Sequence, residues 1–180
     1  TATRRCGFFR ISWLNPNDAM VVIDVNNDHG EGFLEIIPGH NEIVASNPVR
    51  GIFGREGESA GFSGHVVISF DSEFESYGTY AGSDYHRGET TVTGEEAMGG
   101  FVMLKLNPDQ ITRIRVGTSF TSIEEARKNM EAEIPGWDFD TTREALEATW
   151  EEFLGRIEVE GGTPQERNIF YTALYHSCLH

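Results

Sequence analysis

The chain has 180 residues, enough for one domain with a hydrophobic core, or for a domain with an appendage. With 38% hydrophobic residues and 12 Phe it is globular rather than disordered. Its 29 acidic residues against 14 Lys and Arg give a net charge of −15, which argues against nucleic acid and anionic membranes as ligands and favours solubility. No apolar run could span a membrane, and residues 1–6 are too polar for a signal peptide.

The first two thirds of the chain alternate between polar and apolar residues, as strands do. The predicted strands are residues 4–14, 19–25, 33–37, 42–46, 65–70, 74–80, 100–106 and 111–117. Turn residues at 26–30 predict that the second and third strands form a hairpin. The glycine-rich residues 47–64 are expected to be a loop interrupted by a short strand or two, and residues 82–94 an exposed loop or irregular hairpin. Turns rather than helices separate the strands, which predicts an antiparallel β-sandwich.

From residue 122 the spacing of apolar residues changes from two to 3.6, which indicates helices. Ser122 and Glu125 form the start signal of a first helix, and Pro135 and Gly136 end it. The apolar face of this helix is predicted to contain Ile123, Ala126, Met130 and Ile134.

A second helix follows, capped by Asp140 or Thr141 and ended by Gly155. Its apolar stripe is predicted to contain Leu146, Trp150, Phe153 and Leu154. Residues 156–160 fit either a short strand or an extended link. Residues 122–156 therefore resemble a hinge between two domains.

Thr163, Pro164 and Glu166 give the start signal of a third helix. One of its sides is predicted to hold Ile169, Phe170, Ala173, Leu174, Ser177 and Cys178, with Tyr171 and Tyr175 beside it. So many large apolar groups require a partner surface.

Few residues suggest chemistry directly. Asp24 lies inside an apolar strand and would be a buried carboxylate if it faced the core; a turn-capping or Arg-paired structural Asp is the plainer interpretation. Asp84, Tyr85, His86 and Arg87 lie in a polar stretch of the kind that often carries function, although a solvated loop explains them equally simply.

The histidines and cysteines show no complete metal-binding pattern. His176 and His180 have a spacing that zinc can use on a helix, but no third ligand is evident. Cys6 and Cys178 fit buried free thiols, with a disulfide between them as the open alternative. The sequence has no Gly-x-Gly-x-x-Gly or Gly-x-Ser-x-Gly motif, so neither a nucleotide site nor a serine-hydrolase elbow is indicated.

Several short stretches form an ordered set of motifs spread over nearly the whole chain, the most specific of which begin at Val116. They are Thr1-Ala2-Thr3 with Arg5 and Gly7-Phe8, Phe74-Glu75-Ser76 with Gly78-Thr79-Tyr80, Val116-Gly117-Thr118-Ser119-Phe120 followed by Ser122-Ile123-Glu124-Glu125-Ala126-Arg127, Glu133-Ile134-Pro135 with Trp137 and Phe139-Asp140, Leu154-Gly155-Arg156-Ile157, and Phe170-Tyr171-Thr172-Ala173-Leu174-Tyr175-His176-Ser177. Together these stretches resemble the N-terminal half of glycoside hydrolase family 92, the calcium-dependent exo-acting α-mannosidases.

The resemblance implies a supersandwich-like β-sandwich at residues 1–120 that lacks its first strands, a helical linker at 121–162, and the first helix of an (α/α)6 barrel at 163–180. In this family the acid, the base and most calcium ligands come from the barrel, so no catalytic, cofactor-binding or metal residue is assigned within this chain. The implied partners are α-mannoside glycans and the C-terminal catalytic domain.

The implied reaction is inverting, Ca²⁺-dependent hydrolysis of terminal α-mannosides, with α-1,2 bonds among the candidate substrates, in the periplasm, at the cell surface or outside the cell. The chain alone is expected to be inactive. The alternative is a stand-alone carbohydrate-binding or scaffold sandwich.

Overall fold

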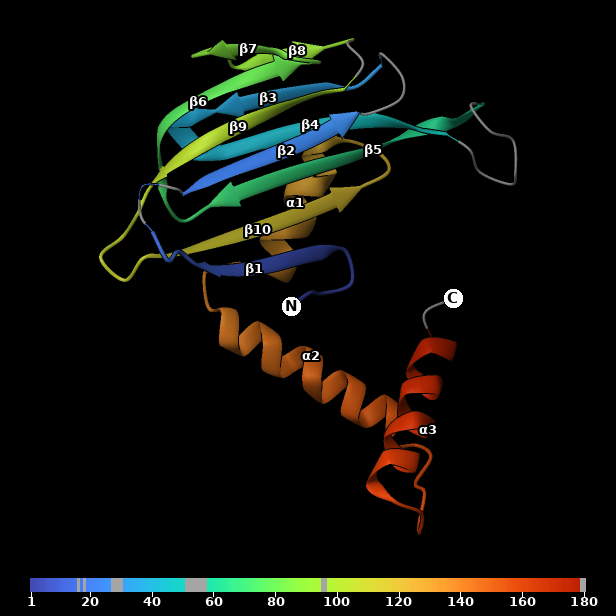
Figure 1. Ribbon diagram of the computed structural model, residues 1–180. Coiled ribbons are helices and arrows are strands. Elements are labelled where there is room, and N and C mark those ends of the chain that lie inside the picture. The colour runs from blue at the N-terminus through green and yellow to red at the C-terminus, as the bar shows by residue number, and fades with distance from the viewer. Residues whose placement is uncertain (16, 18, 27–30, 51–57, 95–96, 179–180) are drawn as a thin grey trace. The chain divides into compact units, whose positions relative to one another are not determined.

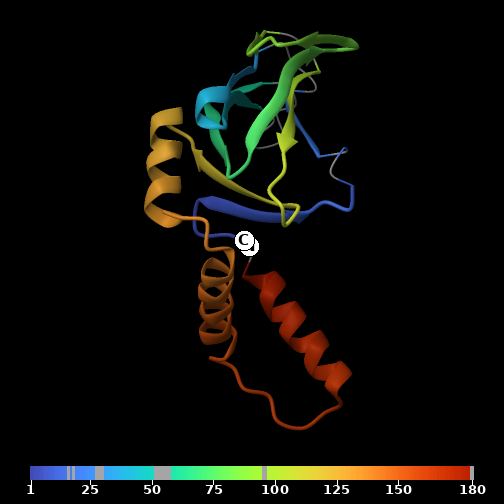
Figure 2. The ribbon, with the colours of Figure 1, turned by 90° about the vertical axis from the view of Figure 1, so that its left-hand side faces the viewer.

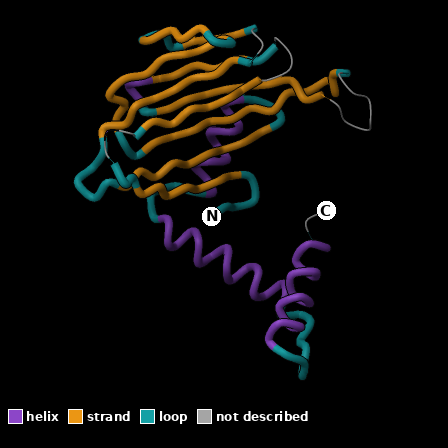
Figure 3. The backbone as a smooth tube through the Cα atoms, viewed as in Figure 1, coloured by secondary structure: helices purple, strands orange, loops and turns teal. Residues whose placement is uncertain are grey.

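The computed structural model describes residues 1–15, 17, 19–26, 31–50, 58–94 and 97–178, and the chain divides into two compact units. The first unit, Thr1–Phe139, contains the strands and helix α1 (Ile123–Glu133); the second, Asp140–His180, contains two further helices (Figures 1 and 3). The predicted domain division at residues 120 and 162 stays a prediction.

The first unit is a sandwich of two antiparallel sheets, as predicted. Sheet A has the strand order β1 (Cys6–Ser12), β10 (Ile111–Ser119), β5 (Ser59–Phe70), β4 (Glu42–Arg50), β3 (Phe33–Ile37) and β8 (Thr91–Thr93). Sheet B has the order β2 (Met20–Asn26), β9 (Met98–Lys105), β6 (Glu73–Ala81) and β7 (Asp84–Arg87). A short 3-10 turn, η2 (Pro38–His40), joins β3 to β4.

The alternating apolar residues of the two sheets meet between them and form the main core. Its buried members include Leu34, Ile36, Ile43, Ile68, Phe70 and Ile114 from sheet A and Val102 and Leu104 from sheet B. This burial of one face of each strand is what the period of two predicts.

Helix α1 covers the other face of sheet A, away from sheet B (Figure 2). Its predicted apolar face is confirmed, because Ala126, Met130 and Ile134 are each at most 2% exposed. The helix comes very close to β10 at Gly117, where an added Cβ would lie 2.3 Å from the Ala126 carbonyl oxygen. The Ser122 hydroxyl caps the helix as predicted and accepts the Glu125 amide at 3.1 Å.

The second unit consists of α2 (Phe139–Leu154) and α3 (Pro164–Ser177). Helix α2 begins at Phe139, before the predicted caps Asp140 and Thr141, and residues 156–160 form no strand, because the chain turns at 156 and bends at 157. The predicted capping box of α3 is confirmed: the Thr163 hydroxyl accepts the Glu166 amide at 3.2 Å, and the Glu166 carboxylate accepts the Thr163 amide at 2.7 Å.

The contacts of α3 differ from the predicted stripe. Tyr175 lies 4.7 Å from Trp150 of α2 between ring centroids, and the Tyr171 hydroxyl donates to the Ile157 carbonyl oxygen at 3.1 Å. Ile169, predicted to lie on the apolar side, is 62% exposed. Within the described residues of this unit, the packing therefore involves the two tyrosines that were placed beside the stripe.

Three strand predictions need comment. The predicted hairpin of the second and third strands is wrong, because β2 pairs with β9 while β3 pairs with β4 and β8. Turn residues mark a change of direction but do not specify which strand becomes the neighbour, and residues 27–30 lie outside the described residues. Much of the expected loop at 47–64 is instead strand, up to Arg50 and again from Ser59, with residues 51–57 not described. Residues 82–94 do not form a hairpin of their own: β7 pairs with the preceding strand β6 in sheet B, whereas β8 pairs with β3 in sheet A.

Candidate functional site

The outer face of sheet B, turned away from sheet A, brings together two residues singled out in the sequence, Asp24 and Tyr85. Asp24 pairs with Gly99, Gly99 with Tyr80, and Tyr80 with Tyr85, so a single row crosses all four strands of the sheet. Paired residues point to the same face. The strand register therefore places the carboxylate and the exposed phenol in one row.

Tyr80 connects the two ends of this row. Its hydroxyl donates a short hydrogen bond to Oδ1 of Asp24, across β9. The ring can lie flat there because Gly99 has no side chain: a Cβ at that position would be 2.4 Å from the phenol oxygen. Burial, followed by the Asp24 carboxylate, raises the pKa of Tyr80 well above its ordinary value. Tyr80 therefore stays a protonated donor that orients Asp24.

The alternative of a buried Asp24 carboxylate is wrong, since Asp24 is exposed. It occupies the outer side of β2, and its neighbours Ile23 and Val25 pack against the core instead. The interpretation of Asp24 as a structural carboxylate is correct in kind, but its partner is a tyrosine rather than an arginine or a turn.

A second aromatic layer lies next to this row. Phe101 pairs with Gly78, and a Cβ on Gly78 would be 2.5 Å from the Phe101 ring, so this ring also lies against a neighbouring strand. Tyr85 is 70% exposed, and its ring centroid is 6.0 Å from Tyr80 and 6.4 Å from Phe101. The result is a cluster of three aromatic rings beside one exposed carboxylate, with Tyr85 tilted against the other two rings.

This arrangement favours binding rather than bond cleavage. Hydrolysis of a glycosidic bond needs two carboxyl groups on opposite sides of the bond. In this row of four residues Asp24 supplies a single carboxylate, which already accepts a hydrogen bond from the Tyr80 hydroxyl. The row therefore offers hydrogen-bond acceptors and aromatic surface but no acid and base pair.

The remaining sequence candidates do not form a metal site. Among residues 1–178, apart from the few that the structure does not describe, no group of three or more His, Cys, Asp or Glu could hold a metal ion. His86 and His176 are exposed, and His180 lies outside the described residues. The expectation that this chain holds no catalytic, cofactor or metal residue stays a prediction.

Both cysteines are free, as the thiol interpretation predicts. Cys6 is buried and Cys178 is half-buried. Burial raises the pKa of the Cys6 thiol, with a further contribution from the Glu133 carboxylate, so Cys6 is an unreactive core residue.

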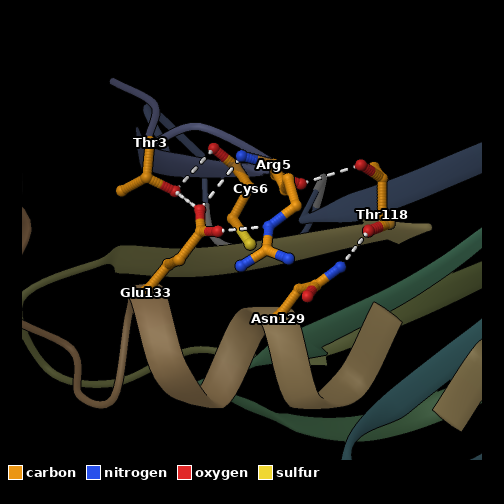
Figure 4. Close-up of polar contacts among 6 residues, drawn as sticks. All are labelled: Thr3, Arg5, Cys6, Thr118, Asn129 and Glu133. Atoms are coloured by element: carbon orange, nitrogen blue, oxygen red, sulfur yellow. Dashed lines mark hydrogen bonds and ion pairs between the residues drawn. The ribbon is translucent and has the colours of Figure 1, made fainter. Parts of the chain in front are cut away.

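A second polar cluster, which we call the clasp, joins the start of the chain to the end of α1 (Figure 4). It consists of Thr3, Arg5, Thr118, Asn129 and Glu133. Oε2 of Glu133 accepts the Thr3 hydroxyl at 2.5 Å and the Arg5 amide at 3.0 Å, and Oε1 accepts the Arg5 guanidinium at 2.6 Å. Thr118 donates its hydroxyl to the Arg5 carbonyl oxygen at 2.8 Å, and Asn129 donates to the Thr118 carbonyl oxygen at 2.8 Å.

The clasp is structural rather than catalytic. Burial alone would raise the pKa of Glu133, but the hydrogen bonds from Thr3 and Arg5 and the Arg5 charge outweigh it and lower this pKa to about 2. A carboxylate held in this way cannot donate a proton near neutral pH. Its effect is to fix α1 on the sandwich.

Two further contacts secure the same helix and the chain that follows it. Arg127 of α1 forms an ion pair with Glu42 of β4. Arg115 of β10 donates to the Ile134 carbonyl oxygen at 2.8 Å and places its guanidinium 4.1 Å from the centroid of the Trp137 ring. Local sequence patterns gave no sign of these contacts, because each joins residues whose proximity depends on the sheet order.

A groove of about 380 Å³ opens beside β2, the edge strand of sheet B. It is lined by a mixture of apolar and polar residues, at positions 23–25, 45–47, 64–66 and 118–120. Phe120 at its end is 70% exposed and contacts Phe62 at 5.4 Å between ring centroids. Asp24 supplies the acidic group of this lining, so the groove also lacks a pair of carboxylates.

Comparison with protein-family models assigns both parts of the chain to one family. Residues 1–119 match the glycosyl hydrolase family 92 N-terminal domain, and residues 125–180 match the glycosyl hydrolase family 92 catalytic domain.

Individual relatives agree with this assignment. The chain is 36% identical over 87 residues to a protein of Arthroderma benhamiae described as an uncharacterized secreted glycosidase, a match that covers 45% of this chain and 11% of that protein. The structure of an inverting mannosidase of family GH92 from Bacteroides thetaiotaomicron matches 99% of this chain with a TM-score of 0.88 at 26% identity. A family GH92 α-mannosidase from the same bacterium has the same fold, with a TM-score of 0.83 at 21% identity over 100% of this chain. The chain spans 23% and 25% of the lengths of these two structures.

Proposed function

Because the chain belongs to glycosyl hydrolase family 92, we propose that it forms the N-terminal sandwich and helical linker of an exo-α-mannosidase that hydrolyses terminal α-mannosides of glycans. The observation that carries this proposal is the structural match to an inverting mannosidase, which extends over 99% of this chain at 26% identity. Since the chain spans 23% of that structure, we assign the activity to a longer protein of which these residues are one part.

We place the catalytic acid and base outside these 180 residues. Inversion requires two carboxyl groups roughly 6.5–9.5 Å apart, with room for a water between them. Three of the less exposed carboxylates among the described residues already form ion pairs: Glu133 with Arg5 in the clasp, Glu42 with Arg127, and Asp71 with Arg113 at 3.0 Å. Carboxylates engaged in this way support the fold rather than the reaction.

The proposed role of this portion is to provide a rigid base for the rest of the enzyme. Beyond the clasp, Phe139 at the start of α2 packs against Phe8 at 5.4 Å between ring centroids and lies under the Arg10 guanidinium at 4.4 Å. The chain is therefore fixed on the sandwich up to the first residue of α2. We propose that the linker helices that start from this point hold the sandwich and the catalytic barrel at one angle, on either side of the active site.

We also propose that the enzyme requires Ca²⁺, as the family resemblance implies. Calcium takes six to eight oxygen ligands, and the described residues contain no cluster of acidic groups that would supply them. This part of the chain does not fit a calcium site by itself, so we derive no step through the ion here.

The proposed enzyme also has an expected cellular location and an expected first substrate. Among the described residues, no helix is long and apolar enough to cross a membrane. The relative described as a secreted glycosidase supports a periplasmic, cell-surface or secreted location for the proposed enzyme. An α-1,2-linked mannobiose is a suitable first substrate among the possible linkages.

A comparison of the 180-residue chain with the longer protein tests the proposal. We expect the longer protein to hydrolyse an aryl α-mannoside in the presence of Ca²⁺, to lose activity with a chelator, and to release β-mannose first, as seen by NMR. We expect no turnover by the 180-residue chain. Turnover by the short chain would overturn our placement of the acid and base, and binding of mannan by the longer protein without turnover would favour the alternative of a carbohydrate-binding module.

A further inference from the structure

We propose that the outer face of sheet B is a binding surface for a neutral glycan, with the Tyr85 ring stacking against a sugar and the Asp24 carboxylate accepting its hydroxyl groups. Three properties of this face support the proposal: an exposed aromatic ring, an oriented acceptor and glycines that let aromatic rings lie close to the strands.

Tyr85 is the exposed aromatic ring. It lies on the short edge strand β7, 70% exposed, yet its orientation is supported by a tilted contact with Tyr80 and an edge contact with Phe101. The C–H groups on one face of a pyranose carry small positive charges, which suit the negative face of an aromatic ring. An aromatic ring that is both exposed and supported loses little side-chain freedom when a ligand binds.

Asp24 is the oriented acceptor. Tyr80 occupies its Oδ1, and among the described residues no group donates to Oδ2. A sugar hydroxyl is a donor of the kind that this oxygen could accept, and a charged acceptor makes a stronger hydrogen bond than a neutral one. Because Tyr80 remains protonated, the carboxylate is already in position before a ligand arrives.

Two glycines let aromatic rings lie close to the strands of this face, Gly99 within the row that joins Asp24 to Tyr85 and Gly78 in the row beside it. Gly99 leaves room for the Tyr80 ring and Gly78 for the Phe101 ring. A side chain at either position would push the ring above it away from the sheet. The aromatic rings therefore lie close to the strands, and a ligand can extend along the row.

Size and charge select a glycan over other partners. Four strands about 4.8 Å apart, with residues on one face about 6.8 Å apart along each strand, give a patch of about 200 Å² for three rows. That is far below the roughly 800 Å² per partner that a stable protein interface buries. A net charge of −15 disfavours anionic ligands such as nucleic acid or phosphorylated peptides. A short neutral oligosaccharide fits both constraints.

The choice of an α-mannan as the ligand rests on the proposed function. The two can nevertheless fail separately, because binding is measured without turnover. Hydrolysis by the longer protein without mannan binding by this chain would remove only the present inference. Mannan binding by this chain with no hydrolysis by the longer protein would remove only the proposed activity.

Affinity electrophoresis of the 180-residue chain in native gels containing soluble α-mannan tests the inference, with α-mannotriose titrations to give dissociation constants. We expect the wild-type chain to be retarded by the mannan. Tyr85→Ala should weaken binding at least tenfold, Asp24→Asn should weaken it several-fold, and Tyr85→Phe, which keeps the ring, should bind nearly as well as wild type. The matched control is Phe120→Ala, which removes another ring that is 70% exposed on the same unit.

Thermal melting of each variant checks that the fold is intact. Because the Tyr85 side chain is largely exposed, Tyr85→Ala should melt within a few degrees of wild type, so a loss of binding would reflect the lost ring. The proposal is overturned if wild-type chain passes through the mannan gel unretarded, or if Tyr85→Ala and Phe120→Ala have equal effects. Equal loss of binding in Tyr85→Phe and Tyr85→Ala would also contradict stacking.

Discussion

Replacement of Glu133 by Gln should destabilise the sandwich at neutral pH much more than the same change at an exposed glutamate. The substitution keeps the shape of the side chain but removes the charge that accepts the Thr3 hydroxyl and the Arg5 amide and guanidinium. The amide nitrogen of Gln would also face one of these donors, which leaves a donor without an acceptor.

The size of the effect follows from the pKa of Glu133, which falls from 4.5 to about 2 in the folded chain. Such a fall corresponds to about 3 kcal/mol of preferential stabilisation of the carboxylate. The Glu133 side chain is 15% exposed but its partner Arg5 is 52% exposed, so water screens part of the interaction. After allowance for this screening, we expect a loss of about 2 kcal/mol.

The pH dependence has a definite sign. The folded-state pKa lies below the unfolded one, so the stabilisation is fully present above about pH 4.5 and disappears as the pH falls toward 2. The difference between wild type and Glu133→Gln should therefore be constant near neutral pH and shrink progressively below pH 4.5.

Urea unfolding followed by tryptophan fluorescence measures this difference. A Trp150→Phe background leaves Trp13 and Trp137 as reporters, both in the first unit. The control is Glu131→Gln, an exposed glutamate on the same helix. The reasoning is refuted if the two variants lose equal stability at pH 7, or if the loss in Glu133→Gln is unchanged at pH 3.

Two other predictions concern Gly117 and Tyr80. Gly117→Ala should lower the free energy of unfolding by about 1–3 kcal/mol, because its Cβ would lie 2.3 Å from the Ala126 carbonyl oxygen. The control Gly136→Ala should be nearly neutral, because its Cβ would meet no atom within 4 Å. Equal effects of the two substitutions would contradict close packing of α1 on β10. In an alkaline titration followed by phenolate absorbance, Tyr80→Phe should remove the last step, because burial and Asp24 raise the pKa of Tyr80. The wild-type chain should also lose stability as the pH rises above about 10, because the unfolded chain releases this proton more readily. A last titration step that survives in Tyr80→Phe would refute this assignment.

The helices show what the sequence can predict, because their start signals are local. Ser122 and Thr163 each cap a helix through an amide three residues later, so the pattern and the contact occupy the same short segment. The buried face of α1 is likewise fixed by the helical period. The start of α2 was missed because Asp138, Asp140 and Thr141 offer several equivalent caps within four residues.

The sheets show what the sequence cannot predict. Alternation identifies β2 and β3 as strands with one buried face, but it does not state that they belong to different sheets. The clasp depends on the same information, since Glu133 meets Thr3 and Arg5 only after β1 has paired with β10. Asp24 and Tyr85 were each identified as candidates, and only the register through Gly99 and Tyr80 shows that they share a row.

The position of α1 affects how substitutions in the linker should be interpreted. Residues 125–180 match the catalytic-domain model, so by sequence α1 is grouped with the helices that follow it. By packing it belongs to the sandwich: Ala126 and Met130 are buried there, whereas α2 and α3 contain no buried residue among those described. A substitution on the buried face of α1 therefore acts through the stability of the sandwich, as does one at Phe139, which packs against Phe8, while we expect one further along α2 to leave that stability unchanged. An effect of such an α2 substitution on the proposed hydrolysis would then have to arise from the helices that follow Phe139. Comparison of the two kinds of substitution therefore separates the proposed scaffold role of the first unit from the proposed linker role of the second.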